Sequence, residues 1–145
     1  MRQVNRDEFT YAIFAALRRW RFTQRRAVFA PIAKRRQMDV WCAAQEVTDA
    51  LRLGKFEFWT PSMEPLSRDP MTAIIEAAIE AFPGAIGKLW LSGIQAREHE
   101  ARATAANLIA DALADFEVLS EAPYGTTLFF PDTPRHAHAL APTWP

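Results

Sequence analysis

Apolar residues recur at helical spacing in several segments of this chain, and prolines or glycines mark where those segments end. Phe9, Ile13 and Leu17 share one face of a helix that we expect over residues 6–20, with Asn5 as its capping residue. Proline has no backbone N–H to donate and disfavours helix at the residue before it, so each proline limits the length of a helix. The pattern therefore predicts several separate helices.

The rest of the chain is predicted in the same way, from apolar periodicity and from the residues that start or stop an element. The further predicted helices are 24–30, ended by Pro31, a stretch within 32–53 that Gly54 ends, 70–82 and 94–115. The predicted strands are 56–59, 88–91, 116–119 and 126–130, the last two joined as a C-terminal β-hairpin through 121–125. The sum is an α+β, mostly helical fold with four to five helices and three to four short strands.

Length and composition place this fold in one domain. A chain of 145 residues buries about two-thirds of its unfolded surface, and 50% hydrophobic residues are too many for a disordered protein. We expect a compact domain over 1–130 and a proline-rich, irregular tail over 131–145. The apolar run at 11–17 is far shorter than the roughly 20 residues of a membrane span. The single cysteine, Cys42, excludes an intrachain disulfide and fits a cytoplasmic location.

Charge is unevenly distributed along the chain, although its formal net charge is zero. Residues 1–36 hold ten Lys/Arg and two acids, a net charge of +8, whereas the remaining residues hold seven Lys/Arg and fifteen acids, a net charge of −8. Nine of the first ten cations are arginines, whose rigid fork of donors suits phosphate. Phe22 and Phe29 lie among them and could stack on unpaired bases, while Trp20 falls on the apolar face of the first helix and is expected in the core.

We therefore expect a small, non-enzymatic binding protein whose basic N-terminal helical region, 1–36, contacts a polyanion, with nucleic acid as the leading candidate. The residues expected to contact phosphates are Arg18, Arg19, Arg21, Arg25, Arg26, Lys34, Arg35 and Arg36. The alternative is a protein–protein interaction or adaptor module, in which this segment pairs with an acidic protein surface or with a second subunit of a homodimer. An exposed face of cations would favour the polyanion. Contacts to Glu76, Glu80, Asp111 or Asp115 would favour neutralisation within the chain.

Other functional patterns are weaker. Residues 94–130 resemble the last helix and wing of a winged helix-turn-helix in their order of elements, but this stretch is acidic where a DNA reader is basic. His136 and His138 form an H-x-H pair without a third ligand at a recognised spacing, so no metal site is predicted. No phosphate loop or nucleophile motif occurs, and no cofactor is predicted. An enzyme would need a pocket that joins His99 or Cys42 to a carboxylate.

Overall fold

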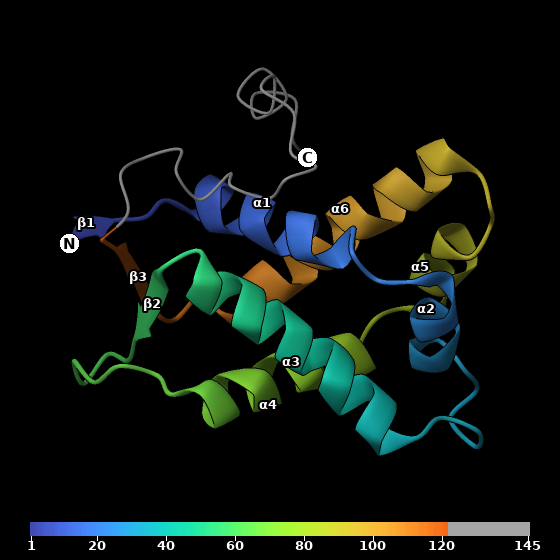
Figure 1. Ribbon diagram of the computed structural model, residues 1–145, viewed down its shortest axis with the longest axis horizontal. Coiled ribbons are helices and arrows are strands. Elements are labelled where there is room, and N and C mark those ends of the chain that lie inside the picture. The colour runs from blue at the N-terminus through green and yellow to red at the C-terminus, as the bar shows by residue number, and fades with distance from the viewer. Residues whose placement is uncertain (122–145) are drawn as a thin grey trace.

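The computed structural model describes residues 1–121, in which six helices accompany a three-stranded antiparallel sheet (Figure 1). In chain order the elements are β1 (Arg2–Gln3), α1 (Arg6–Leu17), α2 (Phe22–Val28), α3 (Gln37–Leu53), β2 (Phe56–Trp59), α4 (Arg68–Glu80), α5 (Gly84–Trp90), α6 (Gln95–Ala112) and β3 (Glu117–Ser120). The predicted class, α+β and mostly helical, is confirmed. The described part has one helix more than the four to five predicted. The tail, 131–145, lies outside the described residues.

The central helix is α1, which packs against both α3 and α6. It begins as predicted, because the Asn5 side chain accepts a hydrogen bond from the Glu8 backbone N–H at 2.9 Å. All residues from Phe9 to Leu17 are buried. A helix that is apolar on every side belongs in the interior, and this explains why its neighbours cover it from more than one direction. The helix ends at Leu17, three residues earlier than predicted.

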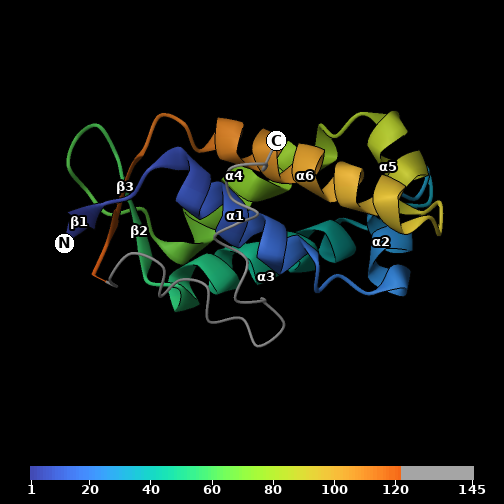
Figure 2. The same cartoon turned by 90° about the horizontal axis from the view of Figure 1, so that it is seen from above.

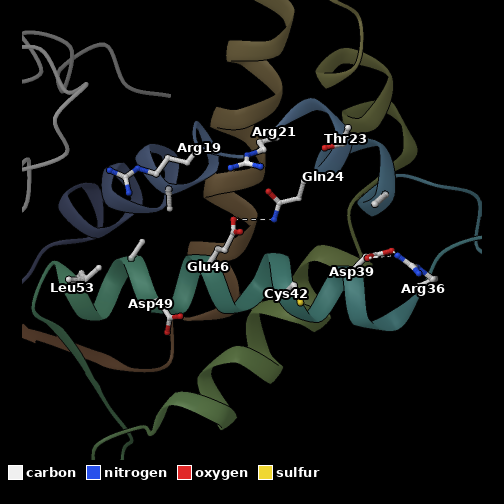
Figure 3. A pocket seen from close by; sticks show the side chains of 13 residues that line it. Arg19, Arg21, Thr23, Gln24, Arg36, Asp39, Cys42, Glu46, Asp49 and Leu53 are labelled. Atoms are coloured by element: carbon white, nitrogen blue, oxygen red, sulfur yellow. Dashed lines mark hydrogen bonds and ion pairs between the residues drawn. The ribbon is translucent and has the colours of Figure 1, made fainter.

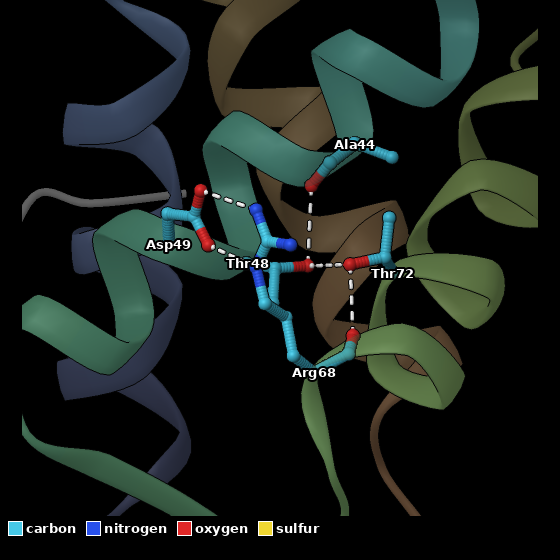
Figure 4. Close-up of polar contacts among 5 residues, drawn as sticks. All are labelled: Ala44, Thr48, Asp49, Arg68 and Thr72. Atoms are coloured by element: carbon cyan, nitrogen blue, oxygen red, sulfur yellow. Dashed lines mark hydrogen bonds and ion pairs between the residues drawn. The ribbon is translucent and has the colours of Figure 1, made fainter.

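Polar contacts join α3 to α4 within this core (Figure 4). The buried Thr72 hydroxyl donates to the Thr48 hydroxyl at 2.9 Å or to the Arg68 carbonyl at 2.8 Å, and Thr48 donates to the Ala44 carbonyl at 3.2 Å. Nearer the surface, the Arg68 guanidinium makes two hydrogen bonds to the Asp49 carboxylate, at 2.8 and 3.0 Å. These contacts fix the register of the two antiparallel helices, which apolar packing alone specifies less tightly.

The sheet has the strand order β1-β3-β2, with β3 in the centre. Phe56 pairs with Ser120 and Phe58 with Val118, and both phenylalanines lie buried on the face that meets the helices. The two-residue strand β1 was not predicted, because two residues carry no periodicity. Both edges of β3 are occupied, by β1 and β2. The second strand of the predicted hairpin, 126–130, lies outside the described residues.

The predicted strand at 88–91 is wrong, because this segment belongs to helix α5. Pro83 stands at the N-cap, where the N–H that proline lacks would have no helical partner. Ile86 and Trp90 are then one turn apart on the buried side of the helix. Four residues of apparent alternation were too short to distinguish a strand from the last turn of a helix.

Two helix starts also differ from prediction. α2 begins at Phe22, two residues earlier than predicted, with Arg21 at the N-cap. α4 begins at Arg68, which makes Pro70 the third residue of the helix instead of the first. The missing N–H of proline is harmless throughout the first turn of a helix, so the proline marked the region of the start but not the first residue.

The sheet lies at one end of the long axis of the molecule, and α2 and α5 lie at the other (Figures 1 and 2). An aromatic cluster holds the second end together. Trp20 stacks on Trp90 with ring centroids 5.1 Å apart, and Phe29 packs against both Trp90 and Phe82. Through these rings, α2 and α5 are anchored to the end of α1. Among the described residues, no helix has both the length and the apolar character needed to cross a bilayer.

Candidate nucleic-acid interface

The charge split along the sequence becomes a split along the long axis of the folded molecule. Residues 18–36, which include α2, hold eight Lys/Arg and no acid, and 84–102, which include α5 and the first half of α6, hold three Lys/Arg and two acids. These two segments meet at the end of the molecule opposite the sheet and together carry a net charge of +9 (Figures 1 and 2). We call them the basic end. Around the sheet, 1–8, 52–69 and 111–121 hold nine acids and five Lys/Arg, a net charge of −4.

The eight predicted cations fall into two groups by exposure. The exposed members are Arg18, Arg19, Arg21, Arg26, Lys34 and Arg36. Arg25 and Arg35 are half-buried and donate to main-chain carbonyls, Arg25 to that of Trp90 at 2.9 Å and Arg35 to that of Ala30 at 3.2 and 3.3 Å. These two side chains help to hold the basic end in shape.

The ion pairs found among the described residues link two of these cations to acids, but not to the four acids whose contacts would have favoured neutralisation within the chain. Arg25 lies 3.5 Å from Glu98 and Arg36 lies 3.1 Å from Asp39. Asp111, one of the four, pairs instead with Arg6, outside the predicted set. Ion pairs found in residues 1–121 therefore engage Arg25 inside the basic end and Arg36 at its border.

One aromatic residue of the basic segment is available at the surface. Phe22 is 47% exposed, and the guanidinium carbons of Arg25 and Arg26 lie 5.4 and 6.0 Å from its ring centroid. Trp20, by contrast, is buried by its stacking on Trp90, as the sequence predicted. An exposed ring beside arginines offers a face on which a base could stack.

A groove of about 820 Å³ lies beside this surface, between the end of α1, α2 and α3 (Figure 3). Its lining residues are Ala16, Arg19, Arg21, Thr23, Gln24, Ala27, Arg36, Asp39, Cys42, Glu46, Asp49, Ala50 and Leu53. The α3 wall supplies its three carboxylates, and Glu46 accepts a hydrogen bond from Gln24 across the groove at 3.1 Å. A polyanion is repelled by that wall, so the groove bounds the basic surface on the α3 side.

Two residues considered for catalysis occupy separate places. Cys42 is exposed in the groove. The His99 ring lies on α6 and packs edge-on against Phe14, with centroids 5.1 Å apart. Burial lowers the pKa of His99, and the charges of Arg102 and Arg18 lower it further. Neither side chain makes a hydrogen bond to a carboxylate among the contacts found in residues 1–121.

Metal chemistry has no support in the described part of the chain, where no three His, Cys, Asp or Glu side chains gather closely enough to hold an ion. The His136 and His138 pair lies outside the described residues.

Sequence reasoning also missed that Lys88, Arg97 and Arg102 belong to the basic end. Only the packing of α5 on α6 and the placement of both beside α2 bring these distant residues together, and no local sequence signal records this.

Known proteins offer no guide to this surface. No family model, curated protein or solved structure matches the chain. Charge, exposure and the contacts of the described residues are therefore the grounds for inferring a function.

Proposed function

We propose that the basic end binds nucleic acid through contacts with the phosphate backbone. The observation that carries this proposal is the net charge of +9 on two segments that the fold brings together, against −4 around the sheet. Such a field attracts a polyanion to one end of the molecule and repels it from the other, so it orients the encounter as well as accelerating it. Contacts of this kind depend on charge and are largely independent of base sequence.

The exposed side chains also favour a single strand over a duplex. Arg21, Arg26 and Lys34 are exposed and are free of the ion pairs found among residues 1–121, so they are ready donors to phosphate oxygens. Phe22 stands beside Arg26 with much of its ring exposed. A base can reach such a ring only when it is unpaired, and one stacked base contributes about 1–3 kcal/mol to binding. We therefore assign single-stranded nucleic acid as the preferred ligand.

The experiment is a titration of single- and double-stranded oligonucleotides at several salt concentrations. Neutralising two phosphate contacts in Arg21→Gln/Arg26→Gln should weaken binding and reduce the slope of log affinity against log salt by about 1.4 for a single strand. The matched control is Arg52→Gln/Lys55→Gln, which removes two exposed cations from the sheet end of the molecule. We expect the control to retain the wild-type slope.

The outcomes separate a specific surface from a general charge effect. If the two double variants lose affinity and slope equally, net charge alone governs binding and the assigned surface is wrong. If the wild-type protein binds neither oligonucleotide at low salt, the proposed function is wrong. Phe22→Ala supplies a second readout, because it should weaken binding to the single strand and leave duplex binding unchanged.

A second candidate is association with another copy of the chain, which the opposite charges of the two ends favour. The basic end of one molecule would meet the acidic sheet end of the next, a head-to-tail contact that does not close by two-fold symmetry. Sedimentation at low and high salt tests this. Self-association that disappears at high salt and in Arg21→Gln/Arg26→Gln would support it, whereas a monomer at all salt concentrations would contradict it.

A further inference from the structure

Two arginines from different helices flank one carboxylate at the basic end. Arg25 of α2 lies 3.5 Å from Glu98 of α6, and their side chains are 13% and 17% exposed. Arg102 follows Glu98 by four residues on α6, so the two share one face of that helix. The Glu98 carboxylate also accepts a hydrogen bond from the Gly93 backbone N–H at 3.1 Å. A single carboxylate that is already hydrogen-bonded thus serves two half-buried guanidinium groups.

A third arginine reaches the same place from α1. α1 and α6 run antiparallel, because Arg6 pairs with Asp111 at one end while the rings of Phe14 and His99 meet at the other. Arg18, one turn beyond Phe14, is close enough to Arg102 and His99 to lower the pKa of both. We call Arg18, Arg25, Glu98, His99 and Arg102 the arginine cluster. With His99 neutral, its net charge is +2.

The positive charge of this cluster is poorly compensated. Burial lowers the pKa of Arg102, as do the charges of Arg18 and Arg25, and only Glu98 opposes them. Arginine does not lose its proton in a protein, so a further counter-ion at this place would relieve the repulsion. The buried Nε atoms of Arg25 and Arg102 have no hydrogen-bond partner among the described residues. The Nε–H groups of both arginines are therefore unused donors among the described residues, while Nη1 of Arg25 donates to the Trp90 carbonyl.

We propose that the arginine cluster is a binding site for a phosphate group. Arg18, Arg25 and Arg102 would surround a dianion from three sides, with charge-assisted hydrogen bonds of the kind that guanidinium forks make to phosphate oxygens. The inference rests on the proposed function only for the molecule that carries the phosphate, which we take to be the 5′-terminal phosphate of a nucleic-acid strand. The site itself is a property of the cluster and takes inorganic phosphate or sulfate as well.

His99 provides a readout inside the cluster. The charges that act on it are those of Arg102, from its own helix, and of Arg18, at the end of α1, and the Phe14 ring covers one side. A bound dianion would offset the two arginines and raise the pKa of His99 toward its ordinary value. Proton binding and dianion binding are thermodynamically linked. A rise of half a unit in the His99 pKa therefore means that the dianion binds about threefold more tightly when His99 is protonated than when it is neutral.

The experiment follows the His99 ring by NMR through a pH titration in sulfate and in chloride at equal ionic strength. Sulfate is the dianion of choice because it does not itself titrate near neutral pH, and His99→Gln identifies the resonance. We expect the His99 pKa to be about half a unit higher in sulfate for the wild-type protein. Arg102→Gln should abolish that difference, whereas Arg97→Gln, which removes an exposed arginine from the same helix, should preserve it.

A second arm compares an oligonucleotide with and without a 5′-terminal phosphate. The phosphate should tighten binding to the wild-type protein and to Arg97→Gln, and should make no difference to Arg102→Gln. Equal His99 pKa values in sulfate and chloride would overturn the site. A sulfate effect with no oligonucleotide binding would keep the site and overturn the proposed nucleic-acid function. Oligonucleotide binding without any 5′-phosphate or Arg102 dependence would keep that function and overturn the assigned ligand.

Discussion

Two glycines in one short helix should respond in opposite ways to the same substitution. Gly87 lies on the buried side of α5, where a Cβ atom would stand 2.9 Å from Cδ1 of Phe29 and 3.2 Å from its Cβ. The Phe29 ring is held between Trp90 and Phe82, so it cannot swing away. Gly84, at the start of the same helix, has no atom within 4 Å of the position that its Cβ would take.

The expected magnitudes follow from these contacts. Gly84→Ala should raise the free energy of unfolding by about 0.5 kcal/mol, because alanine reduces the freedom of the unfolded chain and meets nothing in the folded one. Gly87→Ala has a helix-propensity gain of up to about 1 kcal/mol but must displace Phe29, and such overpacking costs about 1–3 kcal/mol. We expect a net loss of about 1 kcal/mol.

Urea unfolding measures both variants against the wild-type protein, with the m-value as a check that the unfolded state is unchanged. A stabilisation of similar size in both variants would refute the packing of Phe29 on α5. Since this packing anchors α2, it would also undermine the placement of the basic end.

Two further predictions concern the contacts between α3 and α4. Thr48→Val and Thr72→Val should each lower the free energy of unfolding by about 1 kcal/mol, and the double variant should lose less than the sum, because removing both hydroxyls leaves neither without its partner. Strictly additive losses in urea unfolding would contradict the shared hydrogen bond. The hydrogen bond from Arg68 holds the pKa of Asp49 below its ordinary value, so the stabilisation is present at neutral pH and is lost as the pH falls through that lowered pKa. Asp49→Asn should therefore be less stable than the wild-type protein at pH 7 and nearly equal to it at pH 2, and a pH-independent difference in melting temperature would contradict the pairing.

The residue pattern correctly predicted those features of the fold that depend only on residues close together in the sequence. The capping of α1 by Asn5, the strand at 56–59 and the long helices α4 and α6 follow from local periodicity and from end signals. β1 and the pairing of β3 with both of its neighbours depend on segments far apart in the sequence, so no local window contains them.

The candidate site divides in the same manner. The sequence singled out eight cations of the basic segment as candidate phosphate contacts, and six of them are exposed in the fold. It could not predict that Arg25 turns inward to the Trp90 carbonyl, or that Arg25 reaches Glu98 on a distant helix, where Arg102 stands four residues further along. Which arginines face solvent and which meet a carboxylate is decided by helix packing. The arginine cluster could therefore not be predicted from the sequence, because it forms only where α1, α2 and α6 pack together.

The most direct test of the central claim is an NMR footprint of a single-stranded oligonucleotide on the labelled protein at low salt. Binding at the basic end predicts shifts of backbone amide resonances within 18–36 and near Arg97 and Arg102, with those of 56–60 and 117–121 unmoved. Shifts centred on the sheet, or shifts spread evenly over the surface, would contradict the claim.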